Sequence, residues 1–274
     1  MFISYAQHAE DVLINRYFGG KEAGTYVDVG AYDPTVDSVT RHFYDLGWSG
    51  VNIEPLEPRI ARFREERPRD VNLDLAVSDR CGSTTFFEIP AVPGLSTVVE
   101  SNARSAADRH SVEPIARVVR TRTLESICEE LKLDRYDFLK IDVEGHEAEV
   151  LAGANLRDHR PELIVIESTR PGSPLQNHRD WEHRILEADY VFAFFDGLNR
   201  YYVAREHEAK IPRLQVPPNP FDDYTTLRLL KLKEPEVRVA LKVRKFLLRR
   251  PRLRSLVLRL VGRRANRAPG APQH

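Results

Sequence analysis

The sequence contains one stretch that decides its fold, Thr25-Tyr26-Val27-Asp28-Val29-Gly30-Ala31-Tyr32-Asp33-Pro34. The β-branched and aromatic residues at 25–29 predict a short buried strand. Gly30 then allows a tight turn and lets the backbone come close to a ligand, because it has no Cβ. In open α/β sheets, ligands bind outside the carboxyl ends of the strands. The stretch therefore predicts a first strand whose end borders a ligand site.

Strand and helix patterns alternate along the rest of the chain. Further strands are expected at 50–55, 71–77, 138–142 and 162–167, helices at 4–18, 38–46, 57–67, 123–131, 147–152 and 178–187, and a hairpin at 190–195 and 200–203. Such alternation is typical of an α/β fold with a doubly wound, mostly parallel sheet, and the hairpin adds an antiparallel edge. Residues 84–89 are expected to form a strand or hairpin arm. The polar region 90–115 is interpreted as a functional insertion with one short helix near 100–110.

The composition is that of a soluble globular protein, with 274 residues of which 42% are hydrophobic and 30% charged. The two cysteines, Cys81 and Cys128, have no metal-ligand spacing and suggest no disulfide framework, so a reducing cytoplasm is expected. We expect no signal peptide, and no apolar run approaches the ~20 residues of a transmembrane helix.

Charge divides the chain unevenly. Residues 238–267 include twelve basic and no acidic residues. The rest of the chain therefore has 29 basic and 41 acidic residues and is net acidic. We expect a main domain at 1–210, a Pro-rich linker at 211–233 that packs on it through Phe221 and Tyr224, and a basic amphipathic helical tail at 234–274 with a disordered end.

The basic segment 237–264 has apolar residues at helical spacing between its arginines, which fits a helix lying on an anionic membrane surface. It would hold the protein peripherally at the inner membrane face. The alternatives are packing on the acidic body or on a second subunit of a homo-oligomer. Binding to nucleic acid is less favoured, because no aromatic residues are interleaved.

Glu54 follows Asp28 by 26 residues and ends the second predicted strand. An acid at this place can accept hydrogen bonds from a ribose diol; the alternative is a solvated acid in a loop. A dinucleotide site would need G-x-G-x-x-G, and here Gly30 stands alone. This disfavours a nicotinamide-dependent oxidoreductase.

One glycine, an acid on strand one and an acid ending strand two resemble the S-adenosylmethionine methyltransferases of the seven-stranded class. Within that class the chain resembles the FkbM family. The resemblance covers roughly residues 4–205 and rests on Gln7 with Glu10-Asp11, Tyr26-Val27-Asp28-Val29-Gly30-Ala31, Gly47-Trp48-Ser49-Gly50-Val51-Asn52-Ile53-Glu54-Pro55, Ala76-Val77-Ser78, Phe138-Leu139-Lys140-Ile141-Asp142-Val143-Glu144-Gly145-His146-Glu147 and Asp196-Gly197-Leu198-Asn199-Arg200.

The resemblance implies a Rossmann-like class I fold and methyl transfer to oxygen, often to a sugar hydroxyl; a glycan, glycolipid or polyketide-like product is the expected acceptor. It places Asp28 and Gly30 at the methionine end of S-adenosylmethionine, Glu54 at the ribose and the segment Asp74–Ser78 near the adenine. The full set of cofactor-binding residues that we expect is Gln7, Asp28, Gly30, Ala31, Ser38, Glu54, Pro55, Asp74, Ala76, Ser78 and Asp142.

Methyl transfer to a hydroxyl requires a group that takes the proton. The candidates are Asp142, Glu144 and His146 after the fourth strand and Glu167 at the end of the fifth. Crowded acids raise each other's pKa, which would suit a base; alternatively Asp142, Glu144 and Glu167 hold a divalent metal such as magnesium. Without such roles, Glu144 is a helix-start acid and His146 a solvated helix residue. The competing function is a catalytically silent binding module brought to membranes by the tail.

Overall fold

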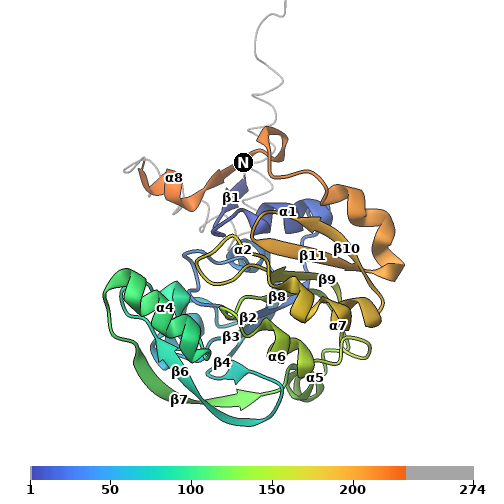
Figure 1. Ribbon diagram of the computed structural model, residues 1–274. Helices are drawn as coiled ribbons and strands as arrows, with labels where there is room; N and C mark the ends of the chain where they lie inside the picture. Colours follow the sequence, from blue (N-terminus) through green and yellow to red (C-terminus); the bar gives the residue numbers. More distant parts are fainter. Residues whose placement is uncertain (1, 233–274) are drawn as a thin grey trace, which may run out of the picture. The chain divides into compact units, whose positions relative to one another are not determined.

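The computed structural model describes residues 2–232 and contains a seven-stranded sheet (Figure 1). The strands lie in the order β10 (Tyr190–Phe195), β11 (Asn199–Ala204), β9 (Arg160–Glu167), β8 (Arg135–Ile141), β2 (Thr25–Val29), β3 (Ser49–Ile53) and β4 (Val71–Leu73). Neighbours from β9 to β4 pair in parallel, whereas β11 pairs antiparallel with both β9 and β10. The predicted α/β sheet with an antiparallel hairpin at its edge is confirmed.

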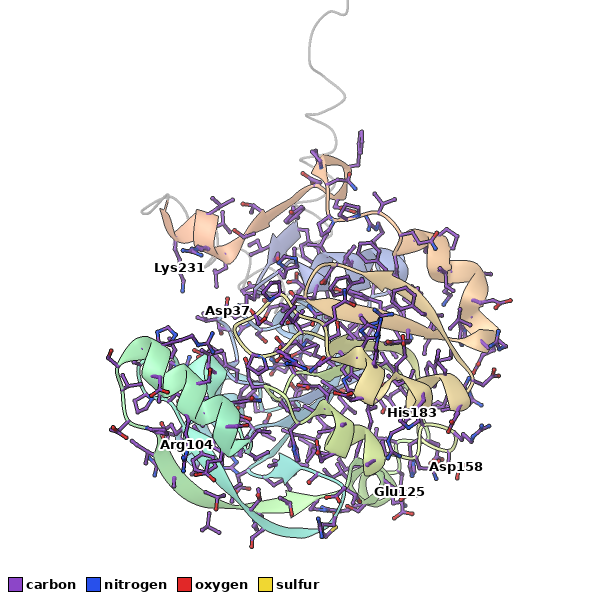
Figure 2. All side chains as sticks on the ribbon, viewed as in Figure 1. Asp37, Arg104, Glu125, Asp158, His183 and Lys231 are labelled. Atoms are coloured by element: carbon purple, nitrogen blue, oxygen red, sulfur yellow. The ribbon has the colours of Figure 1, made fainter. Side chains whose placement is uncertain are left out.

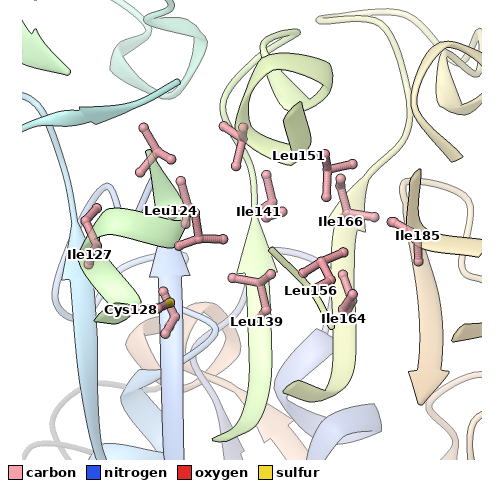
Figure 3. Packing of buried hydrophobic residues seen from close by; sticks show 14 of the residues in the cluster. Leu124, Ile127, Cys128, Leu139, Ile141, Leu151, Leu156, Ile164, Ile166 and Ile185 are labelled. Atoms are coloured by element: carbon pink, nitrogen blue, oxygen red, sulfur yellow. The ribbon is translucent and has the colours of Figure 1, made fainter. Parts of the chain in front are cut away.

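Helices cover both faces of this sheet, because residues alternate between its faces along each buried strand. On one face, side chains such as Leu139 and Ile141 pack against α5 (Leu124–Leu131), α6 (Glu147–Ala152) and α7 (Glu182–Glu187), as Figure 3 shows. On the other, residues such as Phe138 pack against α1 (Glu10–Tyr17) and α2 (Arg41–Leu46). Charged side chains remain on the outer helix surfaces, as with Arg104 and His183 (Figure 2).

A second, three-stranded sheet is formed by the segments on either side of the insertion and has the order β5 (Ala76–Val77), β7 (Ile115–Arg122), β6 (Gly82–Glu88). The helix α4 (Glu100–His110) and the short turn η1 (Pro93–Leu95) lie between β6 and β7. The hairpin arm and the short helix are confirmed. The single strand expected at 71–77 is wrong: β4 stays with the main sheet, whereas Ala76 and Val77 pair with Thr121 and Arg122.

Two expected helix starts are wrong. The first helix begins at Glu10 instead of residue 4, because Ser4 belongs to β1 (Phe2–Ser4) and the carboxylate of Asp11 binds the Ser4 hydroxyl and the Tyr5 amide. α2 begins at Arg41, and the Ser38 hydroxyl accepts a hydrogen bond from Arg67 instead of capping the helix. Residues 178–187 divide into η2 (His178–Asp180) and α7.

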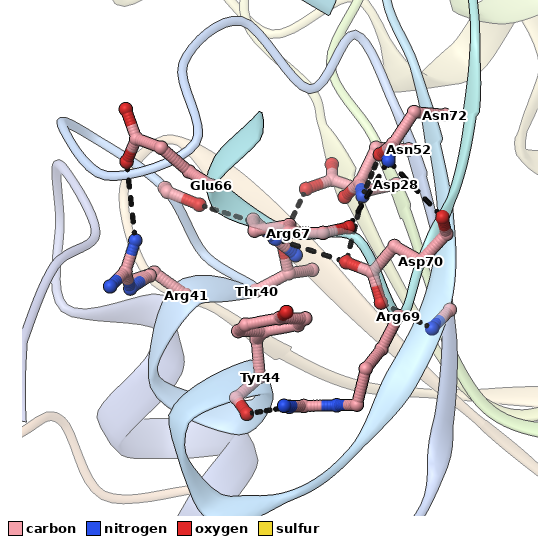
Figure 4. Close-up of polar contacts among 12 residues, drawn as sticks. Asp28, Thr40, Arg41, Tyr44, Asn52, Glu66, Arg67, Arg69, Asp70 and Asn72 are labelled. Carbon is pink, nitrogen blue, oxygen red and sulfur yellow. Dashed lines mark hydrogen bonds and ion pairs between the residues drawn. The ribbon is translucent and has the colours of Figure 1, made fainter. Parts of the chain in front are cut away.

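A buried polar network ties α3 (Glu57–Glu66) to the sheet (Figure 4). Arg67 has no exposed side-chain surface and donates to Asp70 at 3.0 Å, to the Tyr26 hydroxyl at 2.7 Å and to Thr40 at 2.8 Å. Thr40 in turn donates to Asp28, one of the predicted site residues, at 2.9 Å. Strand β2, which carries Tyr26 and Asp28, is therefore linked to the buried guanidinium of Arg67.

The segment after the hairpin contains η3 (Arg205–Arg213), η4 (Pro220–Asp222), β12 (Tyr224–Thr226) and α8 (Leu227–Leu232). Phe221 is 98% exposed, so the expectation that it packs on the body is wrong; Leu214 is the buried residue, in the cluster that includes Leu13 and Ile14. Contacts divide the chain into Met1–Tyr224 and Thr225–His274. The tail predicted at 234–274, with its basic segment 237–264, lies outside the described residues, among which no helix is long and apolar enough to cross a bilayer.

Candidate active site

The site lies at the carboxyl ends of β2 and β8, where the order of strands reverses. From β2 the chain proceeds to β3 and β4 on one side, and from β8 to β9 on the other. Gly30, directly after β2, has a φ of +83°, and a Cβ there would lie 1.8 Å from the carbonyl oxygen of Asp142. Only glycine fits at this close contact between the residues that follow β2 and β8. The two strand ends can therefore approach each other and leave space for a ligand beyond them.

A narrow, mainly apolar cavity of about 60 Å³ opens beside Gly30. Its walls come from β3, from the β4–β5 connection and from the insertion. The apolar lining residues include Ile53, Leu75, Ala76, Val77, Phe86 and Val98. Pro55 and the polar residues Glu54, Asp142, Glu144 and His146 also line the cavity. A narrow apolar cavity bordered by an acid can receive an aromatic base joined to a sugar.

Glu54 lies at the end of β3 and is buried. Its two carboxyl oxygens accept hydrogen bonds from the amides of Tyr32 and Leu56, and Arg59 pairs with it at 3.4 Å. The Arg59 guanidinium also lies over the Tyr32 ring. Burial raises the pKa of Glu54 to about 7, although Arg59 opposes the shift. Arg59 and Tyr32 were not expected as site residues, because their contacts depend on the turn after β2.

A wider cavity of about 390 Å³ adjoins the first, and Gly30, Asp142 and Glu144 line both. Gln7, Asp28, Asp37 and Lys140 contribute further polar side chains to its walls, and Ala31, Val39 and residues 91–95 of the insertion contribute apolar ones. Four of these lining residues are acidic, and Lys140 is basic. The cavity therefore suits a ligand that carries a positive charge and hydroxyl groups.

Lys140 is a functional residue that the sequence reasoning missed. It stands opposite Asp28 in the pairing of β2 with β8 and is fully buried. Its ammonium donates to Asp142 at 3.0 Å and to Asn199 at 3.3 Å, and Asn199 donates to Glu10. Although burial opposes the charge, Asp142 and Glu10 raise the pKa of Lys140. A lysine inside an apolar strand was the available signal, since a buried ammonium needs acidic partners.

Three predicted carboxylates come together. Asp142, Glu144 and Glu167 each place a carboxyl oxygen within 4.8 Å of those of the other two. Burial, followed by the charges of Asp142 and Glu147, raises the pKa of Glu144 to about 9. Burial likewise raises the pKa of Glu167 well above its ordinary value, and Asp142 and Glu144 add to the shift. Glu144 and Glu167 therefore both bind a proton more tightly than an ordinary glutamate does.

The loop that carries Glu144 is fixed from both sides. Thr97 and Asn102 of the insertion each donate to the Glu144 carbonyl oxygen at 3.0 Å. The carboxylate of the buried Glu147 accepts hydrogen bonds from the amides of Val143 and Gly145. Glu144 itself has a φ of +54°, an uncommon conformation for glutamate. These contacts hold a strained turn at the edge of both cavities.

The remaining predicted residues differ in their relation to the two cavities. The ring of His146, which does line the narrow cavity, has Ser78 at one nitrogen and Glu149 at the other, and burial lowers its pKa. The Asp74 carboxylate pairs with Arg120 at 2.9 Å near the surface. Among the described residues, Ser38, Asp74, Ser78 and Glu167 are absent from the lining of these two cavities.

Residues 28–192, more than half of the chain, match the methyltransferase FkbM domain. The chain belongs to the FkbM methyltransferase family. S-adenosylmethionine is the methyl donor that this membership implies, and the seven-stranded sheet agrees with the class I methyltransferase fold. A search of curated proteins finds no match. The narrow apolar cavity, the acid at the end of β3 and the glycine at the contact between the strand ends fit an adenosine that carries a charged sulfonium.

Proposed function

We propose that this FkbM methyltransferase transfers a methyl group to a hydroxyl oxygen of a sugar, glycolipid or polyketide-like acceptor. The observation that carries the proposal is the carboxylate cluster at the ends of β8 and β9, two members of which open into the wide polar cavity. A hydroxyl needs a proton acceptor before it can attack, whereas an already basic nitrogen does not. A carboxylate beside the acceptor can take that proton when it is itself ionised.

Each part of the donor has a proposed place. Glu54 accepts hydrogen bonds from the ribose hydroxyls, Ala76 and Val77 flank the adenine in the narrow cavity, and Asp28 and Gly30 border the methionine end. Gln7, Ala31 and Pro55 also line the cavities and belong to the proposed cofactor-binding set. Ser38, Asp74 and Ser78 complete that set, although they are not part of the cavity lining. Asp142 lines both cavities and therefore stands where the methyl group and the acceptor meet.

S-adenosylmethionine supplies a methyl group on a positively charged sulfur. As the acceptor oxygen forms its bond to the methyl carbon, the carbon–sulfur bond breaks and its electron pair stays on sulfur, which gives S-adenosylhomocysteine. The hydroxyl proton passes to a carboxylate, and Asp142, Glu144 and Glu167 are the candidates, with His146 as a further one. The protein contributes alignment of oxygen, carbon and sulfur, which is an orientation effect.

Magnesium remains a candidate second cofactor at the same carboxylates, which are ligands that a hard cation prefers. A cytoplasmic location is likewise a proposal, based on the two cysteines that suggest no disulfide framework. Peripheral attachment at the inner membrane face and assembly into homo-oligomers are proposals that rest on the sequence pattern of 237–264. An acceptor held in a lipid would fit that location.

Calorimetric titration with S-adenosylhomocysteine is the first test, followed by release of that product from S-adenosylmethionine in the presence of hydroxyl-bearing sugars. We expect micromolar binding and product release that depends on the acceptor. Binding with methylation of an amine instead of a hydroxyl would overturn the O-methyl assignment. A folded protein that does not bind the product would favour the silent binding module.

A further inference from the structure

We propose that Asp142, Glu144 and Glu167 form a site for one hard divalent cation, magnesium or manganese, which faces the wide cavity. Their carboxyl oxygens lie within 4.8 Å of one another. An octahedral ion with bonds of about 2.1 Å needs ligand oxygens about 3.0 Å apart when adjacent and about 4.2 Å apart when opposite. A small inward movement of the side chains would therefore close the three carboxylates around an ion.

Two buried oxygens in the cluster lack partners, which is the independent sign of a ligand. Glu167 is only 7% exposed, and within residues 2–232 neither its Oε2 nor that of Glu144 has a hydrogen-bond partner. Burying polar atoms without partners is costly, so native structures avoid it. The neighbouring Glu147 is equally buried, but backbone amides and Asn177 satisfy both of its oxygens. Other buried polar atoms in residues 2–232 also lack partners, such as the Tyr17 hydroxyl and the Trp181 ring nitrogen, but the only carboxylate oxygens among them are those of Glu144 and Glu167.

The local charge also fits a dication. Lys140 occupies only Oδ2 of Asp142, at 3.0 Å, and leaves the other oxygen of that carboxylate for an ion. Three ionised carboxylates and one ammonium have a net charge of −2, which a divalent cation balances. A buried group of charges is tolerated only when it is compensated in this way.

The position of the ion would define the acceptor class. Asp142 and Glu144 line the wide cavity, so an ion that they hold would be accessible from that cavity. Magnesium keeps several of its six positions for water or substrate, and these would face the cavity. A ligand with two adjacent oxygens, such as the vicinal hydroxyls of a sugar, could take two of them. This last step rests on the proposed O-methyl transfer, whereas the cation site does not.

Manganese titration of the full chain, monitored by electron paramagnetic resonance without any cofactor, tests the site. We expect one bound manganese per chain, displaced by magnesium. Glu167→Gln and Glu144→Gln should each weaken binding by about tenfold or more, because each removes a charged ligand. Glu187→Gln, at an exposed position of α7, is the matched control and should bind manganese like the unmodified protein.

Absence of binding at millimolar manganese, or variants that bind as tightly as the unmodified chain, would overturn the site. Circular dichroism checks the fold, and Glu144→Gln decides the question if Glu167→Gln does not fold. Binding of S-adenosylhomocysteine without any manganese binding would overturn the cation site and leave the proposed transferase activity standing. Manganese binding without S-adenosylhomocysteine binding would support the cation site and overturn the proposed transferase activity.

Discussion

Gly30 is the residue on which the shape of the site depends most directly. We expect Gly30→Ala to lower the free energy of unfolding by about 3 kcal/mol or more and to abolish S-adenosylhomocysteine binding. The alanine would suffer both a left-handed conformation and an overlap with the Asp142 carbonyl oxygen. Urea denaturation measures the first effect and calorimetry the second.

Gly20→Ala is the matched control for this change. Gly20 also has a positive φ, +74°, but a Cβ there would meet no atom within 4 Å. The control should cost about 1 kcal/mol, which is the conformational part alone. Equal costs for the two variants would show that the overlap at Gly30 is relieved by movement of β8.

Glu54 gives the site a pH dependence. Its pKa of about 7 means that it is half protonated at neutral pH, whereas ribose hydroxyls donate best to the carboxylate. We therefore expect S-adenosylhomocysteine affinity to fall by up to about tenfold per pH unit below pH 7, with proton release on binding. Calorimetry in buffers of different ionisation enthalpy measures both. Glu54→Gln should bind more weakly at pH 8 and lose the pH dependence.

The same shift acts on folding in the opposite sense. Because the folded pKa lies above the ordinary value of 4.5, the protonated Glu54 stabilises the fold below about pH 4.5, and this contribution is lost as the pH rises through about 7. Glu57→Gln is the control variant for the pH dependence, because the Glu57 carboxylate is exposed on α3. If affinity in the unmodified protein were constant between pH 6 and 8, the ribose role of Glu54 would be excluded.

Among the elements, α4 has a task beyond packing, because its Asn102 holds the loop between β8 and α6. We expect Asn102→Ala to weaken S-adenosylhomocysteine binding by about fivefold, corresponding to one lost hydrogen bond of about 1 kcal/mol, and to speed amide exchange in residues 143–146. Arg104→Ala is the control on the same helix, since Arg104 is exposed (Figure 2) and, among the described residues, its ion pair is with Glu100 of α4. Equal exchange in both variants would contradict the anchoring role.

At this scale the sequence predicts the presence of elements better than their limits. Runs such as Leu163–Ile166 are apolar on both faces, and this pattern identifies a central parallel strand without further help. The start of α1 could not be predicted, because the bond between Ser4 and Asp11 holds the chain extended there. The separation of Ala76 from β4 depends on pairing with Thr121, 45 residues later, which local patterns do not contain.

At the scale of the whole molecule, the Arg67 network joins α2, α3 and the first strands. We expect Arg67→Met to lower the free energy of unfolding by about 3–5 kcal/mol, because it leaves the carboxylate of Asp70 buried without its cation. Arg64→Met, on an exposed face of α3, should change it by less than about 1 kcal/mol. Thermal and urea denaturation measure the difference. Similar small costs for both would contradict the role of Arg67 as the centre of the network.

The site itself was predictable where it follows from strand ends. Gly30, Glu54 and Asp142 each come directly after a strand, and parallel strands bring such positions to one edge of the sheet. Lys140, Arg59 and the loop around Thr97 could not be inferred in the same way, because their roles arise from contacts between segments far apart in the sequence. Distant contacts of this kind also decide which acids lose their solvent.

The position of β11 has a consequence for how the chain is made. On the ribosome, β9 and β10 emerge before the strand that must lie between them. Until residues 199–204 are synthesised, the hydrogen-bonding edge of the apolar strand β9 lacks its partner, and such an edge can pair with other nascent chains. Asn199 at the start of β11 also joins Lys140 to Glu10. The candidate active site therefore remains incomplete until β11 has been translated.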